Sequence, residues 1–367
     1  MKRFLFIAAI AGAALVSCTK NEVVEVAEQD AITFAAPVTA NITKAVEIVG
    51  NYPSNLNFSV FGHYFTGDYT TIAEGQLYMN NVKTAYSPAV VGWDPAAVTG
   101  GVNYYWPKQG TITFAAYSPS DCTPVAYNEA GIQFPNFTVA PQAENQFDLL
   151  FSERAYNQTK ADMTTVEDPY KGVQIKFNHA LSSIFFTVKS DKDYTADKFR
   201  IEVTKIELQN VAANGSFTQG LEDENLSSTA ANTDHPGWTV NADSKTDYVA
   251  FSGAQQLTTT ATATNNIEIR DNNKNNTNLI LLPQPLEGTE DEAGVTLYVE
   301  YTIYNDNTNA VVYQNATLPI TNYGIVYQWY RGNRYTYNIT IGLDKIYFDP
   351  TVTEWYDVPS GSVTIGK

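Results

Sequence analysis

Alternation of apolar and polar residues at every second position is the main pattern in this chain. It is clearest over residues 295–303, where the apolar positions are Val295, Leu297, Val299, Tyr301 and Ile303. A period of two is typical of a β-strand with one buried face. Turn-forming Asn and Asp residues follow, and a second apolar segment lies at 310–318. The pattern therefore predicts a pair of strands over 295–318.

Short apolar segments separated by turn residues recur along most of the chain. They lie at 32–36, 58–62, 76–79, 111–117, 132–139, 147–151, 173–177, 181–188, 199–208, 248–251, 267–269, 279–282 and 334–341. The face that carries the apolar residues changes near Thr204, which predicts a β-bulge. No segment longer than the N-terminal stretch over residues 1–17 shows a convincing helical period. The sequence therefore predicts an all-β fold of antiparallel strands in two tandem sandwiches.

A polar stretch over residues 152–170 suggests where the two sandwiches are divided. We expect an N-terminal β-sandwich domain over 45–168 and a C-terminal one, with the terminal strands, over 169–367. Residues 220–275 are rich in Asn, Thr, Asp and Ser, so we expect long loops there with short strands between them.

The first eighteen residues have the organisation of a bacterial lipoprotein signal. Lys2 and Arg3 give a basic start, an apolar stretch follows, and Leu15-Val16-Ser17-Cys18 closes it. This predicts a signal peptide over 1–17 and lipidation of Cys18, with a tether and a first strand over 18–44. Acyl chains on Cys18 would hold the precursor to the outer membrane.

Composition supports strands and argues against nucleic-acid binding. The chain has 24 Tyr, 18 Phe and 5 Trp, and aromatic residues are common in strands. Its formal charge of −17 would become −19 once Lys2 and Arg3 are lost with the signal peptide. Binding to phosphates needs clustered Lys and Arg, and no basic run follows Arg3. We therefore expect no nucleic-acid partner.

The sequence offers little that resembles an active site. His63, His179 and His235 are too far apart in sequence to form a local metal motif, so we expect no metal, cofactor or enzymatic activity. Acidic runs at 222–224 and 290–292 could bind calcium, but solvated loops explain them better. Cys122, with no basic neighbour, is expected to be a buried apolar residue rather than a nucleophile.

Several segments taken together resemble the fimbrillin-like (type V pilin) family of Bacteroidota lipoproteins. Besides the lipoprotein signal, these segments are Ile32 and Phe34, Thr43-Lys44-Ala45, Tyr105-Trp106-Pro107, Thr113-Phe114-Ala115-Ala116-Tyr117-Ser118-Pro119, Gln146-Phe147-Asp148-Leu149-Leu150, Phe177-Asn178-His179-Ala180-Leu181 and Arg334-Tyr335-Thr336-Tyr337 before Trp355. The resemblance covers most of the chain. It implies transthyretin-like sandwiches and a structural subunit of a surface fimbria that supports cell adhesion.

The resemblance also implies a processing step. In the family, a trypsin-like protease specific for Arg or Lys cuts after a basic residue in the N-terminal segment, which corresponds here to Lys44-Ala45. The cut removes the lipid and the first strand, here an edge strand carrying Ile32, Phe34 and Ala36. Family members commonly have Arg at the cut, whereas this chain has Lys. A strand from the next subunit then fills the slot, so other pilin subunits are the expected partners.

The C-terminal stretch contains candidate donor strands. The alternating residues that would fill the slot include Trp355, Val363 and Ile365. Two alternatives remain open. This stretch could be a closing strand of its own domain, or the subunit could cap a fimbria and have no strand to lend.

A lipid-anchored, monomeric module that binds surface glycan is the alternative function. Aromatic rings stack on sugar faces, and Trp93, Trp106, Trp238, Trp329 or Tyr residues are candidate platforms, although we expect most of them to pack in the sandwiches or line turns. A host or bacterial surface glycan or protein would then be the partner. A pilin should lose about 44 residues on maturation, in keeping with a cut after Lys44, whereas the glycan-binding module should stay full-length from Cys18.

Overall fold

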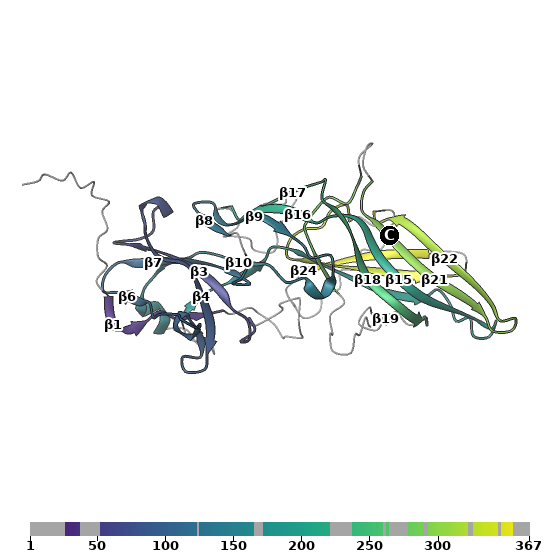
Figure 1. Cartoon of the computed structure of the whole chain (residues 1–367), viewed down its shortest axis with the longest axis horizontal. Helices are drawn as coiled ribbons and strands as arrows, with labels where there is room; N and C mark the ends of the chain where they lie inside the picture. The colour runs from purple at the N-terminus through teal and green to yellow at the C-terminus, as the bar shows by residue number, and fades with distance from the viewer. Residues whose placement is uncertain are drawn as a thin grey trace, which may run out of the picture.

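Strands dominate the part of the chain that the structure describes, which confirms the predicted all-β class. The structure is a computed structural model and describes residues 26–36, 52–122, 125–164, 172–220, 237–259, 262–263, 278–288, 293–321, 326–343 and 346–354. Its helical elements are short 3-10 turns: η1 (Ile72–Glu74), η2 (Pro95–Ala97), η3 (Ala143–Asn145) and η4 (Lys160–Thr164). Figure 1 shows an elongated molecule, with the early strands at one end and β21 and β22 at the other.

One large sheet organises the N-terminal half. Its strands, in spatial order, are β12 (Val173–Gln174), β2 (Phe34–Ala35), β5 (Gly92–Asp94), β4 (Gln76–Ser87), β3 (Phe58–Phe65), β7 (Thr111–Ser118), β10 (Leu150–Ser152) and β13 (Phe177–His179). β11 (Ala155–Gln158) also pairs with β7. Beside this sheet, β1 (Val26–Ala31) pairs with β6 (Tyr105–Pro107).

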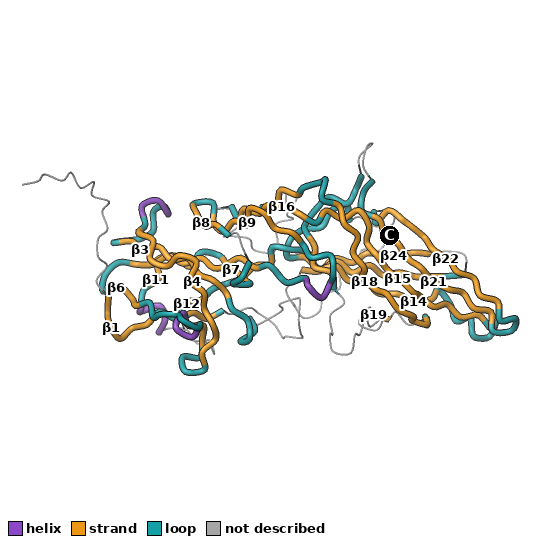
Figure 2. Tube along the Cα trace, viewed as in Figure 1, coloured by secondary structure: helices purple, strands orange, loops and turns teal. Residues whose placement is uncertain are grey.

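A four-stranded sheet lies beside the first one and combines strands from both halves of the chain. Its order is β17 (Trp238–Val240), β16 (Asn214–Thr218), β9 (Gly131–Thr138) and β8 (Ala126–Asn128). Figure 2 shows β8, β9 and β16 along the same side of the molecule. Phe217 of β16 packs against Phe134 of β9 and Phe151 of β10, with ring centroids 5.7 Å and 5.0 Å apart.

Two further sheets build the C-terminal half. The first contains β19 (Thr262–Ala263), β14 (Ser182–Ser190), β23 (Asn333–Ile341) and β24 (Ile346–Glu354), with β20 (Leu279–Leu281) also paired to β14. The second contains β18 (Lys245–Gln256), β15 (Phe199–Ala212), β21 (Thr296–Asn305) and β22 (Ala310–Pro319). The predicted pair over 295–318 is the β21–β22 hairpin.

Details of strand pairing both match and depart from the pattern in the sequence. The bulge predicted near Thr204 is confirmed, because the β15–β21 register shifts between Val203 and Lys205. The expected short strand over 248–251 is part of the twelve-residue β18. Although most pairs are antiparallel, as expected, β14–β23 and β12–β2 are parallel. Alternation identifies a strand but carries no information on the direction of its neighbour.

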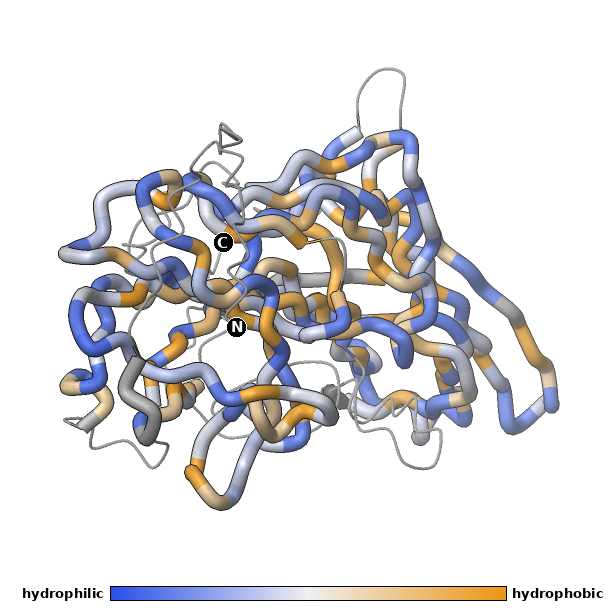
Figure 3. Tube along the Cα trace, turned by 60° about the vertical axis from the view of Figure 1, so that its left-hand side comes forward, coloured by the Kyte–Doolittle hydropathy of each residue, from blue (hydrophilic) through white to orange (hydrophobic). Residues whose placement is uncertain are grey.

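The buried residues form two apolar clusters. The smaller one fills one side of the first sheet and contains Ile32, Phe34, Phe58, Trp93 and Phe114. The larger one runs from the other side of that sheet, at Phe61 and Tyr117, through to the C-terminal half. β3 and β7 are therefore covered on both faces, which explains why almost all of their residues are buried. Figure 3 shows apolar and polar residues interspersed along the trace.

The division predicted after residue 168 does not follow the sheets. β12 and β13 come after it but pair with β2 and β10 of the first sheet. β16 and β17, which also follow it, form one sheet with β9. The polar composition of 152–170 indicates an exposed segment, but it does not determine which sheet the next strand joins. The domain limits 45–168 and 169–367 therefore stay predictions.

A buried acid–histidine pair joins two of the segments singled out in the sequence. Asp148 precedes β10, and His179 ends β13. The His179 Nδ1 and Asp148 Oδ2 atoms are 2.8 Å apart, and both side chains are buried. Nearby, the indole Nε1 of Trp238 donates a 2.6 Å hydrogen bond to the carbonyl of Ala180. These bonds fix the point where the chain leaves the first sheet for the C-terminal half.

Candidate functional site

The segment that contains β2 occupies a slot in the first sheet. β2 lies between β5, to which it is antiparallel, and β12, to which it is parallel. The amide of Ile32 donates to the carbonyl of Tyr104 at 2.7 Å. On the other side, the amides of Val173 and Ile175 donate to the carbonyls of Thr33 and Ala35, both at 2.8 Å. The backbone of this short segment is therefore bonded on both sides.

The side chains of the same segment fill the smaller apolar cluster. Ile32, Phe34 and Ala36 are completely buried. The ring of Phe34 meets Phe114 edge to face, with centroids 5.3 Å apart, and contacts Phe58 in the same way at 6.2 Å. Such pairs add about 0.5–1.5 kcal/mol to the free energy gained from burial alone. The cluster is thus completed by residues from the N-terminal end of the described chain.

Gly172 allows the close approach of β12 to this segment. Its φ of +130° lies in a region that L side chains rarely adopt. A Cβ atom at this position would lie 2.5 Å from both the carbonyl carbon and the oxygen of Thr33. Only glycine satisfies both restrictions without displacing backbone. The residue therefore belongs to the slot, and no motif in the sequence singled it out.

The prediction that Ile32–Ala36 forms an edge strand is wrong, because β12 lies outside β2. The pattern Ile-x-Phe shows that one face is apolar, but it does not reveal how many neighbours the strand has. The structural consequence is substantial: a segment in this position bridges β5 and β12. Its absence would leave unpaired groups on two strands rather than on one.

β1 leads directly into the slot and makes contacts of its own with neighbouring elements. It pairs with β6, in a register that sets Ala31 opposite Tyr105. The carboxylate of Asp30 lies 2.6 Å from the ammonium nitrogen of Lys160 on η4. This ion pair is partly exposed, so its contribution is about 1 kcal/mol or less. The segment before β2 is therefore anchored mainly by backbone pairing.

The other predicted site residues are not brought together in the described structure. Cys18, Lys44, Ala45, Trp355, Val363 and Ile365 lie outside the described residues, as does His235. The expectation that most of the candidate aromatic residues pack inside is confirmed for Trp93, Trp106, Trp238 and Trp329, whose exposed fractions are only 0%, 2%, 8% and 0%, so none of these four can serve as a sugar platform. Tryptophan composition cannot distinguish a stacking platform from a core residue, and here all four pack inside.

The remaining candidate groups do not form a reactive site either. Burial, together with the nearby charge of Arg154, lowers the pKa of His63. Burial raises the pKa of the Cys122 thiol to about 12, so the reactive thiolate is disfavoured at neutral pH. Within the described ranges, no three His, Cys, Asp or Glu side chains are grouped so that they could bind a metal. No helix in that part of the chain is long and apolar enough to cross a membrane.

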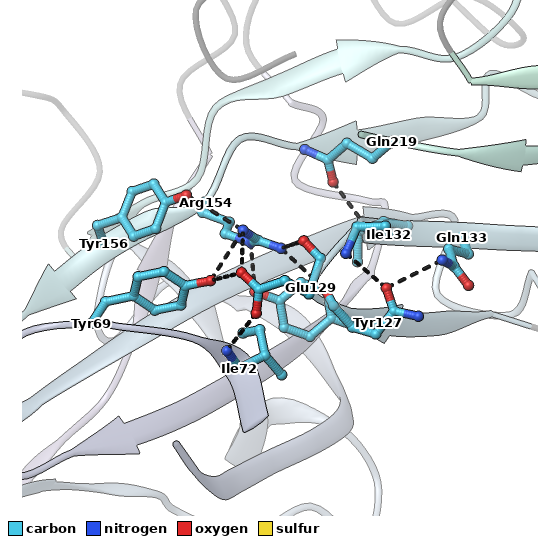
Figure 4. A network of polar contacts seen from close by, with 11 residues as sticks. Tyr69, Ile72, Tyr127, Glu129, Ile132, Gln133, Arg154, Tyr156 and Gln219 are labelled. Atoms are coloured by element: carbon cyan, nitrogen blue, oxygen red, sulfur yellow. Dashed lines mark hydrogen bonds and ion pairs between the residues drawn. The ribbon is translucent and has the colours of Figure 1, made fainter. Parts of the chain in front are cut away.

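A buried arginine forms a second feature that the sequence did not reveal. The Arg154 side chain is only 1% exposed. Its Nη2 donates to the carbonyls of Asn128 and Glu129 at 3.0 Å and 2.5 Å, and its Nε donates to the Tyr127 hydroxyl at 3.1 Å. Figure 4 shows Tyr127 and Glu129 next to the Arg154 guanidinium. The arginine thereby fixes the β8–β9 turn against the segment between β10 and β11.

Glu129 connects this arginine to the loop after β3. Its Oε1 accepts a 2.6 Å hydrogen bond from the Tyr69 hydroxyl, and its Oε2 accepts a 2.7 Å bond from the Ile72 amide. Partial burial opposes ionisation of this carboxyl. The two hydrogen bonds and the charge of Arg154 outweigh that effect and lower the pKa of Glu129. The polar groups of this network satisfy one another's hydrogen bonds, so the network has a structural role.

Replacing Gly172 should loosen the slot. We expect Gly172→Ala to cost about 2 kcal/mol or more of folding stability, because the new Cβ would meet the backbone of Thr33 in a disfavoured conformation. Amide hydrogen exchange of residues 31–36 should rise in this variant. Gly67→Ala is the matched control, since nothing lies within 4 Å of its Cβ position. Equal protection in both variants would show that β12 does not hold the segment.

Glu129 should give stability a specific dependence on pH. Because its pKa is lowered in the folded state, it stabilises the fold above its unfolded pKa of about 4.3. This contribution is lost as pH falls through the folded value. We expect Glu129→Gln to be less stable than wild type at pH 7, by about 1 kcal/mol or less because the side chain is 46% exposed.

The difference between the two proteins should shrink as the pH falls below the unfolded pKa of about 4.3, as measured by urea unfolding. Glu144→Gln, at an exposed position on η3, is the matched control and should change little over the same pH range. A Glu129→Gln protein that is as stable as wild type at pH 7 would contradict the assignment.

Comparisons with known proteins agree with this architecture. The profile of the fimbrillin-like family matches residues 43–355. A fimbrial protein from Bacteroides vulgatus is 18% identical and has a TM-score of 0.55, covering 89% of this chain and 99% of that one. A candidate cell adhesion protein from Bacteroides uniformis is 14% identical, with a TM-score of 0.50 and the same coverage.

These two likenesses concern the fold alone, because the sequence identities are low. No curated protein matches the chain. The family profile, however, spans most of the sequence, from just before Lys44 to Trp355. The chain therefore belongs to the fimbrillin-like family.

Proposed function

We propose that this protein is a structural subunit of a surface fimbria that supports cell adhesion. In this proposal it is exported as a lipoprotein anchored through Cys18, cut after Lys44 and polymerised by strand exchange. The observation that carries the proposal is the burial of Ile32, Phe34 and Ala36 inside the first sheet. Lys44 lies only eight residues after Ala36 in the sequence. A single cut there would detach a segment that completes a core.

Loss of the segment would leave a costly vacancy. Burying a side chain such as Ile32 or Phe34 contributes about 1.5–3 kcal/mol. The amides of Val173 and Ile175 would also lose their acceptors, at about 1–3 kcal/mol for each group that stays buried. The processed protein would therefore gain free energy from any strand that restores both sets of contacts. This gain drives assembly without any other energy source.

The geometry of the slot defines the incoming strand. It must pair with β5 on one side and β12 on the other, and it must place alternate apolar side chains where Ile32 and Phe34 lie. The C-terminal stretch has this alternation, with Val363 and Ile365 separated by Thr364. Trp355 precedes it as a further candidate contact. In the proposal, this stretch of one subunit enters the slot of the next.

The cellular route follows from the same steps. The precursor would be held at the outer membrane by lipid, and a protease specific for Arg or Lys would release it into a growing fimbria at the cell surface. Other fimbrial subunits are then the partners, and a host or bacterial surface glycan or protein is the target of adhesion. Burial of Trp93, Trp106, Trp238 and Trp329 removes the main support for the alternative of a monomeric glycan binder.

Substitution of the cut site tests processing. We expect Lys44→Ala to stop formation of a product that begins at Ala45, because trypsin-like proteases need a basic residue before the bond. N-terminal sequencing of surface-sheared material measures this directly, and gels run after mild heating measure the polymer ladder. Lys83→Ala, at an exposed position on β4, is the matched control and should be processed normally. A normal polymer ladder from Lys44→Ala would contradict the proposed cut after Lys44.

Truncation of the tail tests the donor strand. Deleting Gly361–Lys367 removes Val363 and Ile365, so we expect normal cleavage after Lys44 but at least a tenfold loss of polymer. Val363→Asp should have a similar effect, because a charge in an apolar slot is unfavourable. Ser362→Asp, at a neighbouring position with the opposite facing, should polymerise. Polymers of unchanged length from the truncated chain would show that residues 361–367 are not the donor strand.

A further inference from the structure

β22 is an unusually long edge strand. It forms one margin of the second C-terminal sheet and, within the described residues, pairs with β21 alone. All ten of its residues are in unbroken register with β21, from Ala310 opposite Asn305 to Pro319 opposite Thr296. Figure 1 shows the strand on the outer side of the sheet, at the far end from β1. Every second residue of such an edge presents backbone groups with no partner in the sheet.

The edge formed by β22 lacks the features that usually prevent association of strands. None of its ten residues is charged, and its proline, Pro319, stands at the end. Val311 and Val312 are 43% and 47% exposed. Charges, internal prolines and bulges are the common devices that make an edge unsuitable for pairing. In this strand the described structure shows none of them.

The other long edges of the same half do carry such features. β18, at the opposite margin of the sheet, contains Lys245 and Asp247 and has three register shifts against β15. β24, the edge of the neighbouring sheet, contains Asp349, Pro350 and Glu354. β22 is thus the exception among the long edge strands in the described part of the chain. The contrast makes this edge the one most open to pairing with another strand.

A second copy of this chain is a suitable partner, because a neutral edge strand can pair with its own copy about a two-fold axis. The formal charge of −17 makes most encounters between two copies repulsive. Along β22 this repulsion is weakest, since the strand is neutral and β21 beside it contributes only Glu300. At the hairpin turn, Asp306 is paired with Arg200 at 3.2 Å. The uncharged edge is therefore a place where two acidic subunits can meet.

We propose that two copies associate side by side through antiparallel pairing of their β22 strands. A two-fold axis normal to the sheet sets residues of the same face opposite each other, so it must lie midway between one residue and the same residue of the other copy. With the two Asn315 residues facing each other across the axis, Val312 of one copy stands opposite Leu318 of the other. These two residues share the face that pairs with Ile303 and Leu297 of β21. Two four-stranded sheets then become one continuous sheet.

This association is lateral and does not use the slot of β2. It would be present before cleavage at Lys44 and would not involve the C-terminal stretch. It goes beyond the proposed function, which joins subunits end to end, because it predicts a contact between neighbouring fimbriae or between subunits before assembly. Experiments on chains carrying Lys44→Ala examine it without any contribution from strand exchange.

Concentration-dependent association is the first measurement. We expect the full chain with Lys44→Ala to sediment as a monomer–dimer equilibrium. Val312→Lys should weaken the dimer about tenfold or more, because the two-fold axis places a charge on both copies at the contact. Val249→Lys, at a 38% exposed position on the β18 edge, is the matched control and should leave the equilibrium unchanged.

Disulfide trapping is the second measurement, and it tests the register. Residues opposite each other in an antiparallel pair have Cα atoms about 4.5–5.5 Å apart, which a disulfide can span. In a chain with Cys18→Ser and Cys122→Ala, Asn315→Cys should give an oxidised dimer several-fold faster than Val249→Cys. A strictly monomeric wild type, equal effects of Val312→Lys and Val249→Lys, or equal trapping at both cysteines would overturn the proposal.

Discussion

The fold of the N-terminal half depends on a segment inserted between β5 and β12. Phe34 closes the apolar cluster by meeting Phe114 edge to face at 5.3 Å, and the backbone of the segment pairs with β5 on one side and β12 on the other. Because the segment is interior rather than peripheral, it cannot be removed without disturbing two strands. Gly172, with its φ of +130°, shows that the second neighbour is fitted to the segment at backbone distance.

The sequence predicted those properties that depend on one strand at a time. Alternation identified the β21–β22 pair and the apolar face of Ile32 and Phe34, and a change of parity near Thr204 located the bulge in β15. It did not predict which strands are neighbours. The interior position of β2 and the contribution of β12 and β13 to the first sheet depend on contacts between distant residues. A period of two carries no information about such contacts.

The aromatic composition has a related explanation. Trp93, Phe34 and Phe58 pack in the smaller cluster, so the rings that could have served a ligand stabilise the sheet instead. Arg154 was missed for the opposite reason, since a single Arg between polar residues gives no sign that it is buried. Its burial is tolerated because carbonyls and hydroxyls from the β8–β9 turn surround the guanidinium and Glu129 balances its charge. Only the folded chain brings these groups together.

The parallel pairing of β14 with β23 sets the order in which this chain can fold. Ser183 lies opposite Arg334, a separation of 151 residues, and the register continues to Ser190 opposite Ile341. Long-range pairing of this kind is intrinsically slow, because a large loop must close, with a loss of chain entropy, before the stabilising contacts can form. The edge of β14 that pairs with β23 must therefore wait for its partner until nearly the whole polypeptide has been synthesised. Chains in that interval are the ones most exposed to aggregation and most dependent on chaperones.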